Sequence, residues 1–465
     1  MPTLSYKHHN VLMSESPKTT YFWSRNIRLF LDLCLLFIFI TSSFDNFLNL
    51  KISGFSIRAC NLLMIFFSTV VFFMTIFSSK PLKFKLLGFW SFLIWTIFLI
   101  LFIQNSIIIQ RGIGYIIWLL IFFTFILSLA AYIEKPSHFE HILKIYLLSF
   151  NIVALIGLLQ FFLTFVGIEF YLSYYFASGI PRIHAFSYEP SYFSTYLIIP
   201  WIFHFYLYFS NLNDLKKKVN NRFSILLLTG GLLLSFSRMG ILFMLVALCI
   251  KLVQIIVPAI RKLRIKKKEF YFIGFMSVGF FILIGVAIRF SKYFISVFEG
   301  LPIFSKYAHS ASIRIDDLLD TWRIFEHSPW TGYSLGGIAP AIARLNGYGS
   351  LTQEIVKEHE GMSILLEVLA ASGIVGFIFF MIFLSKVIFS SRKMKKQLLS
   401  SYTNNLINHL SCHRILIIAL IAQLLLLCLN QNILRNYLWI HIGMINLSFF
   451  IFKETTETIR KVENV

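Results

Sequence analysis

Charged side chains that could bind an anion or transfer a proton gather in a few stretches of this sequence. One stretch reads R-I-H-A-F-S-Y-E-P-S and contains Arg182, His184 and Glu189. Another reads S-F-S-R-M-G, where Arg238 joins two apolar runs with almost no loop between them. Burying a guanidinium there costs several kcal/mol unless an anion neutralises it or a water-filled cavity solvates it. Arginine stays charged and can bond phosphate oxygens bidentately, so these stretches predict a site for a strongly anionic group.

A further stretch, residues 312–337, reads as a helix followed by a glycine-rich turn. Apolar side chains at spacings of three and four predict an amphipathic helix over residues 312–326. That apolar stripe consists of Ile315, Leu318, Leu319, Trp322 and Phe325. Arg314 and Asp317 fall on the other face, one turn apart. The glycines of the turn would let backbone approach a ligand; they are Gly332, Gly336 and Gly337.

His359 and Glu360 precede the apolar run that begins near residue 363. The start of a helix favours anions through its dipole and its free N–H groups. Each stretch also has a plainer interpretation as an aromatic belt with a snorkelling arginine, a solvated charge run or a helix cap. Taken together, the arginines, histidines and carboxylates predict one cavity that binds a diphosphate.

Membrane-spanning helices must position these side chains. Of the 465 residues, 57% are hydrophobic and 14% are charged, and the mean hydropathy is +0.76. The apolar runs reach the roughly 20 residues that a helix needs to cross about 30 Å of hydrocarbon. The chain lacks the alternating pattern of an outer-membrane barrel. The sequence excludes soluble enzyme folds and predicts an all-α integral membrane protein, residues 1–465 in one polytopic domain, with about twelve transmembrane helices.

The net charge is +21, and the positions of the basic residues indicate the membrane topology. Lysines and arginines lie in short segments between apolar runs, whereas a nucleic-acid site would gather them on one face with aromatic residues interleaved. The positive-inside rule then predicts that both termini are cytoplasmic, and no cleavable signal peptide is expected. The basic cytoplasmic loops would face anionic membrane lipids. Two large periplasmic loops follow, residues 169–191 and residues 291–362, the second between helices 9 and 10.

The order of these pieces resembles the O-antigen polymerase and ligase superfamily of bacterial envelope assembly, the Wzy and WaaL type. The matching pieces are R-x-H-A-F-S-Y-E-P-S at residues 182–191, S-F-S-R-M-G ending at Gly240, R-I-D-D-L-L-D-T-W…P-W-T-G-Y-S-L-G at residues 314–336, and L-L-E-V-L-A-A-S-G-I-V-G at residues 365–376. The resemblance implies a GT-C-like fold in the bacterial inner membrane. It also implies a glycosyltransferase without metal or other cofactor, which uses an undecaprenyl-diphosphate-linked oligosaccharide on the periplasmic face.

The resemblance also assigns roles to individual residues. Arg238 and Arg314 match the two arginines with which the family holds the diphosphate, and Arg182 matches a further basic position of the polymerases. Guanidiniums there would stabilise the charge that develops on the leaving diphosphate. For the general base, His359 is the first choice and Glu189 the second. The remaining acid–base or acceptor contacts are Asp317, Glu360 and His184.

The ligase pattern separates the two halves of the superfamily. It places His-Asn shortly before the G-x-x-G of residues 373–376, where this chain has Met362 and Ser363, and His359 lies three residues earlier. This departure favours a polymerase over a ligase that transfers the polymer to lipid A-core. A polysaccharide flippase is the other alternative, although it should place ionisable residues near the bilayer midplane. A chain-length regulator is a further possible protein partner.

Overall fold

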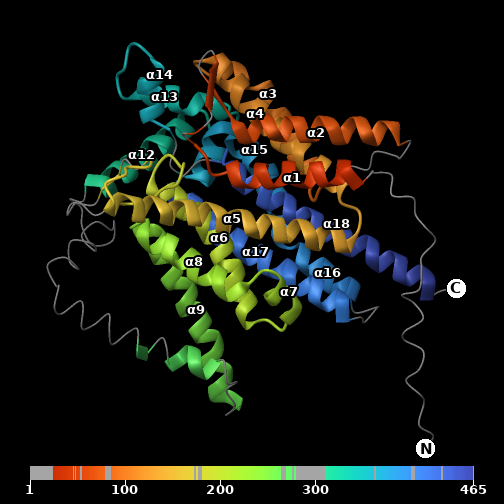
Figure 1. Cartoon of the computed structure of the whole chain (residues 1–465). Helices are drawn as coiled ribbons and strands as arrows, with labels where there is room; N and C mark the ends of the chain where they lie inside the picture. Colours follow the sequence, from red (N-terminus) through yellow and green to blue (C-terminus); the bar gives the residue numbers. More distant parts are fainter. Residues whose placement is uncertain are drawn as a thin grey trace, which may run out of the picture.

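The structure is a computed structural model, and it describes residues 25–45, 47, 49–52, 55–78, 85–171, 174–175, 181–262, 269–274, 277–278, 309–360, 363–398, 404–430 and 433–463. Helices dominate this part of the chain, as Figure 1 shows. A short antiparallel hairpin, β1 (Asn49–Ile52) and β2 (Phe55–Arg58), joins the first two helices. The prediction of an all-α membrane protein is confirmed in these coarse terms.

Most helices of the first half follow one another through short connections, and the first large loop separates α5 from α6. They are α1 (Arg25–Thr41), α2 (Ala59–Phe77), α3 (Phe89–Leu101), α4 (Ile109–Tyr132), α5 (Pro136–Phe165), α6 (Pro190–Phe209), α7 (Asn213–Lys218), α8 (Asn221–Leu234) and α9 (Arg238–Lys262). A short 3-10 turn, η2 (Ile103–Asn105), lies between α3 and α4.

The second half contributes α12 (His309–His327), η3 (Leu335–Gly337), α13 (Ile338–Leu345), α14 (Gln353–Glu358), α15 (Ile364–Ile388), α16 (Ser390–Leu398), α17 (Asn404–Asn430) and α18 (Asn436–Glu463). In Figure 1, α12, α13 and α14 lie together, away from the end of the molecule that carries the C-terminus. The predicted amphipathic helix over residues 312–326 is therefore present as α12.

Six helical stretches of the described chain are long and apolar enough to cross a membrane. They are Ala59–Phe77, Ile109–Tyr132, Pro136–Phe165, Arg238–Ile260, Ile364–Leu398 and Asn404–Leu429. The count of about twelve crossings, the GT-C-like arrangement and the sidedness stay predictions. Most of the expected span at residues 270–290, and residues 291–308 of the second large loop, lie outside the described residues.

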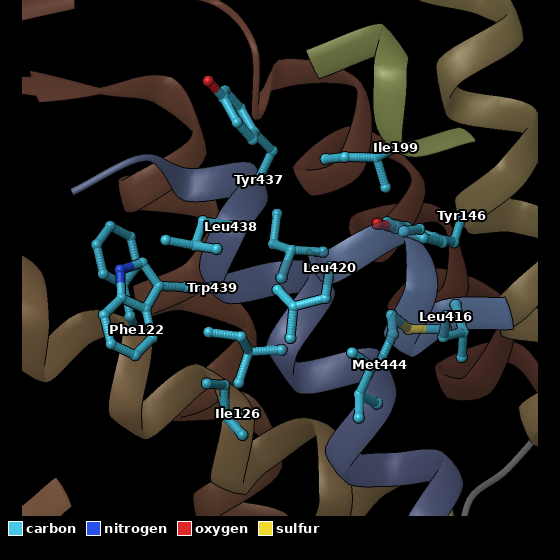
Figure 2. Packing of buried hydrophobic residues seen from close by; sticks show 14 of the residues in the cluster. Phe122, Ile126, Tyr146, Ile199, Leu416, Leu420, Tyr437, Leu438, Trp439 and Met444 are labelled. Atoms are coloured by element: carbon cyan, nitrogen blue, oxygen red, sulfur yellow. The ribbon is translucent and has the colours of Figure 1, made fainter. Parts of the chain in front are cut away.

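The centre of the bundle is built from α6, α17 and α18. Helix α6 is buried along most of its length and packs against α8, α9 and α17. Figure 2 shows the packing around α18, where Trp439 stacks on Phe122 of α4 with ring centroids 5.8 Å apart. Because lipid tails are as apolar as these side chains, close van der Waals packing holds the helices together. Aromatic residues provide much of that contact.

One end of the bundle gathers the segments that carry the predicted site. We call it the loop end, and it comprises residues 42–45, 55–58, 181–189, 235–237, 328–360 and 433–435. The contacts that join these segments include Asp45 N to Phe186 O at 2.9 Å, Ile183 N to Leu234 O at 3.2 Å, and Lys357 Nζ over the Tyr188 ring at 4.8 Å. The first loop and the end of the second loop therefore meet, although they are far apart in sequence.

The glycine-rich turn after α12 packs against helices. Gly373 interrupts α15 with φ +60° and ψ −173°, which leaves nearby backbone groups without helical partners. The turn supplies replacements: Tyr333 N donates to Ala370 O at 3.1 Å, Ser334 N donates to Ala371 O at 2.8 Å, and Ile374 N donates to Pro329 O at 2.8 Å. A Cβ on Gly332 would lie 2.4 Å from the Ala371 carbonyl, and one on Gly336 would lie 2.6 Å from that of Arg111. At both positions the small residue permits approach to a helix, where the sequence had predicted approach to a ligand.

Candidate functional site

Arg182 fixes the turn between α8 and α9. Its Nε donates to Ser235 O and its Nη2 donates to Phe236 O, each at 3.4 Å. Phe236 has a positive φ of 46°, which is rare for a residue with a side chain and occurs in the tight turn that ends just before Arg238. The arginine of the first loop thus braces the backbone that positions the arginine of the second motif.

Arg238 is the first residue of α9 and is half-buried. The helix can start there because Gly240 faces Ser194 of α6, where a Cβ would lie only 2.7 Å from the Ser194 Cβ. In the described part of the chain, Arg238 has no carboxylate within ion-pair distance. The close approach of α6 and α9 therefore holds an uncompensated guanidinium at the loop end.

The charges of Arg182, Arg238 and Glu189 influence one another. Burial lowers the pKa of Arg182, the nearby Glu189 raises it, and the positive charge of Arg238 lowers it further. Glu189 precedes Pro190, the first residue of α6, and its Oε1 accepts a hydrogen bond from Ser191 Oγ. Arg182 thus lies near one carboxylate and one further guanidinium, and the three side chains together carry a net positive charge that an anion would balance.

A second group of arginines at the loop end was not predicted from the sequence. Asp45 Oδ1 accepts from Arg58 Nη1 at 3.0 Å and from Arg435 Nη1 at 3.2 Å. The guanidinium of Arg435 also lies over the Tyr192 ring, 4.0 Å from its centroid. The signal that could have found Arg435 is the one used for Arg238, an arginine at the start of an apolar run after a very short connection.

Glu360 completes this second group. Its Oε1 accepts from Arg111 Nη2 at 3.0 Å and from the Tyr115 hydroxyl at 3.2 Å. Burial lowers the pKa of Arg435, but the anionic groups around it, Asp45 and Glu360 among them, outweigh burial and raise it. Each arginine here already has a carboxylate, so this group stabilises the loop end and differs from the Arg182 and Arg238 pair.

His359 ends α14 and is half-buried. Its ring lies 5.3 Å from the ring of Tyr348, centroid to centroid. Its Nε2 is buried, with no hydrogen-bond partner among the described residues. One ring nitrogen of this imidazole is thus without a hydrogen bond in the described part of the chain. Lys357 brings the same segment against Tyr188 of the first loop.

His184 takes a structural position. Its ring is buried, its Nδ1 hydrogen-bonds to Ser187 O at 2.9 Å, and its backbone N donates to Gln160 Oε1 at 3.3 Å. Burial lowers the pKa of His184, although the hydrogen bond to Ser187 opposes this. The neutral ring therefore holds the bend of the first loop.

The acidic side chains of α12 differ in burial and in their partners. Asp317 is half-buried, and the side chain of Arg314 lies outside the described part. Asp320 is buried and joins α12 to the end of α13, because Asn346 Nδ2 donates to it at 2.9 Å. Much of the predicted apolar stripe is exposed, since Ile324 and Thr321 form the buried side instead. The exposed members of the stripe are Ile315, Leu319 and Trp322.

The described residues contain no group of three or more His, Cys, Asp or Glu side chains that could hold a metal ion. Basic side chains are the groups that this end of the bundle offers to a ligand.

Comparison with known families gives one match. A family model described as O-antigen ligase matches residues 223–381. This range covers most of α8, all of α9 and α12–α14, and α15 as far as residue 381. It includes Arg238, Arg314 and His359 but not the first loop. No curated protein matches the chain. The family match confirms the resemblance to the O-antigen polymerase and ligase superfamily.

Proposed function

We propose that this relative of the O-antigen polymerases and ligases is a membrane glycosyltransferase that polymerises undecaprenyl-diphosphate-linked oligosaccharides on the periplasmic face. The observation that supports this most is the pair formed by Arg182 and Arg238. Arg182 lies near both Glu189 and Arg238, and neither arginine forms a salt bridge among the described residues, so the two guanidiniums can accept a further anion. A diphosphate has the charge and the oxygen geometry that guanidiniums bind.

In the proposed reaction an acceptor hydroxyl attacks the anomeric carbon of the donor glycan. The bond between that carbon and the diphosphate oxygen breaks, and undecaprenyl diphosphate leaves with the bonding electrons. Arg238 and Arg314 stabilise the charge that develops on the leaving oxygen, and Arg182 positions Arg238 through the turn at Phe236. The hydroxyl proton passes to a base of the protein.

We assign that base to His359 first and to Glu189 second. The Nε2 of His359 has no partner among the described residues, so a substrate hydroxyl could occupy that position. Glu189 lies beside Arg182, and its Oε1 already accepts a hydrogen bond from Ser191. This oxygen is therefore less available to a substrate hydroxyl than the Nε2 of His359. Asp317 and Glu360 are the remaining candidates for acceptor contacts. The bonds from Arg111 and Tyr115 to Glu360 favour a structural role for that carboxylate.

O-antigen ligase is the second candidate function, because the matching family model carries that description. Against it stands the pair Met362 and Ser363, at the place where the ligase pattern has His-Asn. A flippase is the third candidate. It is less well supported because the arginines described above gather at one end of the bundle, whereas transport sites lie near the bilayer midplane.

The test is to incubate the purified protein with its lipid-linked repeat unit and to separate the products by size. A polymerase gives a ladder, whereas a ligase gives product only when lipid A-core is added. Arg238→Ala and Arg314→Ala should each lower the rate at least about 100-fold, as expected for loss of a group that stabilises transition-state charge. Arg323→Ala is the matched control, since this α12 arginine is mostly exposed and its one ion pair among the described residues is with Asp320. Unchanged ladders in both arginine variants would contradict the mechanism.

A further inference from the structure

A groove on the outer face of α15 lies at the opposite end of the bundle from the candidate site. It encloses about 450 Å³ and is lined by Phe377, Ile378, Met381, Ile382, Ser385, Lys386, Phe389 and Lys393. Most of these side chains fall in two rows with a spacing of four residues, so they share one face of a continuous helical stretch. The groove is therefore a shallow, open strip along one face of α15 and the start of α16.

The two ends of the groove differ in chemistry. Apolar side chains line it from Phe377 to Ile382, and Lys386 follows about 14 Å from Phe377 along a helix, which is close to half of the roughly 30 Å hydrocarbon thickness. The ammonium groups of Lys386 and Lys393 lie at the other end. A ligand that fits both parts has one leaflet's length of hydrocarbon and an anionic head.

The positive charge at that end is not neutralised within the described chain. Residues 377–398 contain no aspartate or glutamate. Lys386 Nζ donates to Ser91 Oγ at 3.2 Å, and neither Lys386 nor Lys393 forms an ion pair among the described residues. Arg392 lies over the Phe389 ring at 4.5 Å and adds to the charge beside the groove. Phosphate is the anion that a membrane supplies at this depth.

We propose that this groove is a binding site for one anionic glycerophospholipid. One acyl chain lies along Phe377, Met381 and Ile382, and the phosphate lies between Lys386 and Lys393. A zwitterionic lipid of the same chain length fills the apolar part equally well, but its own ammonium group opposes the lysines. The site therefore discriminates by headgroup charge and is independent of the glycosyltransferase proposal.

The test is native mass spectrometry of the purified protein with added dioleoylphosphatidylglycerol or dioleoylphosphatidylcholine. We expect at least about tenfold tighter binding of phosphatidylglycerol, because each basic group near the surface contributes about fivefold in affinity for an anionic lipid. The double variant Lys386→Gln/Lys393→Gln should lose this preference. The matched control is Lys395→Gln/Lys396→Gln, which removes the same charge from α16 at positions that do not line the groove.

Two further variants separate this site from general attraction of lipid to a basic surface. Lys393→Gln alone changes an exposed side chain, so its loss of affinity cannot result from misfolding. Ile378→Trp/Ile382→Trp fills the apolar part and should weaken both lipids. Equal affinity for the two lipids in the parent protein would overturn the proposal. So would equal losses in the two lysine pairs, or unchanged binding after the groove is filled.

Discussion

At the scale of single residues, an arginine's role depends on what already balances its charge. Asp45 and Glu360 neutralise the buried arginines of the second group, which therefore act as structural ties. Arg182 lies near Glu189 and Arg238, and neither of these two arginines forms a salt bridge in the described part of the chain. Sequence motifs identified Arg182 and Arg238, but they could not show which arginines of the chain are neutralised, because the pairing partners are far apart in sequence.

Asp45→Asn tests the structural tie. The change leaves Arg58 and Arg435 without their carboxylate, and removing one partner of a buried ion pair costs about 3–5 kcal/mol. The matched control is Glu140→Gln, whose carboxylate bonds Lys218 at 2.6 Å on the surface, where such pairs contribute at most about 1 kcal/mol. In thermal unfolding in detergent, Asp45→Asn should lower the melting temperature much more than Glu140→Gln does. Equal shifts would show that the Asp45 pairs are no stronger than a surface pair.

His184 gives a prediction about pH. Burial lowers its pKa below the ordinary value of 6.5, so the folded state keeps the ring neutral where the unfolded state binds a proton. The unfolded state then binds more protons below pH 6.5, and the folded state loses stability as pH falls through that range. We expect the melting temperature of the parent protein to approach that of His184→Gln between pH 7.5 and pH 5. Parallel pH profiles for the two proteins would contradict this.

At the scale of elements, the break in α15 is the feature that the sequence could locate but not interpret. The G-x-x-G at residues 373–376 is visible in the sequence, and so is the proline that ends α12. Their mutual contact is not visible, because it depends on how the turn and the helix pack. The prediction that the apolar stripe of α12 is its buried side was wrong for a similar reason. Periodicity identifies the helix, whereas tertiary packing selects Thr321 and Ile324 as its buried side.

Gly373→Ala tests whether this break holds the turn in place. A Cβ at residue 373 would lie 2.3 Å from the carbonyl carbon of Trp330, and φ is +60°. Overpacking of about 1–3 kcal/mol then adds to about 1–3 kcal/mol of backbone strain, because φ +60° with ψ −173° is a conformation that glycine almost alone adopts. Gly347→Ala is the control, because its φ is +86° but nothing lies within 4 Å of the added Cβ. The first variant should lose both thermal stability and activity, and the second should lose only a little stability.

A result in which both glycine variants lose stability equally would mean that strain alone matters at residue 373. The turn would then not depend on close approach to α15.

At the scale of the whole molecule, the sequence was most informative about the fold class and least informative about how the helices are arranged. Hydropathy identified the membrane helices that carry strong apolar runs, such as α4 and α17. Helix α6 is among the most buried elements, yet its tyrosines and its histidine keep it out of the six strongest candidates. Burial inside a bundle allows a polar composition that a lipid-facing helix could not tolerate.

Sidedness is the property of the whole molecule that most needs a measurement. The loop end carries the two groups of arginines, whereas α16 at the opposite end carries lysines that form no ion pair among the described residues. The positive-inside rule places such lysines in the cytoplasm. In a background without the native cysteines, Gly349→Cys should react with a membrane-impermeant maleimide applied from outside the inner membrane. Lys395→Cys should react only after the membrane is permeabilised. Both positions are exposed, so access to the thiol depends on the side of the membrane and not on burial. Labelling of the α16 cysteine in sealed cells would reverse the orientation, and it would move the proposed arginine site to the cytoplasm, where a periplasmic polymerase cannot act.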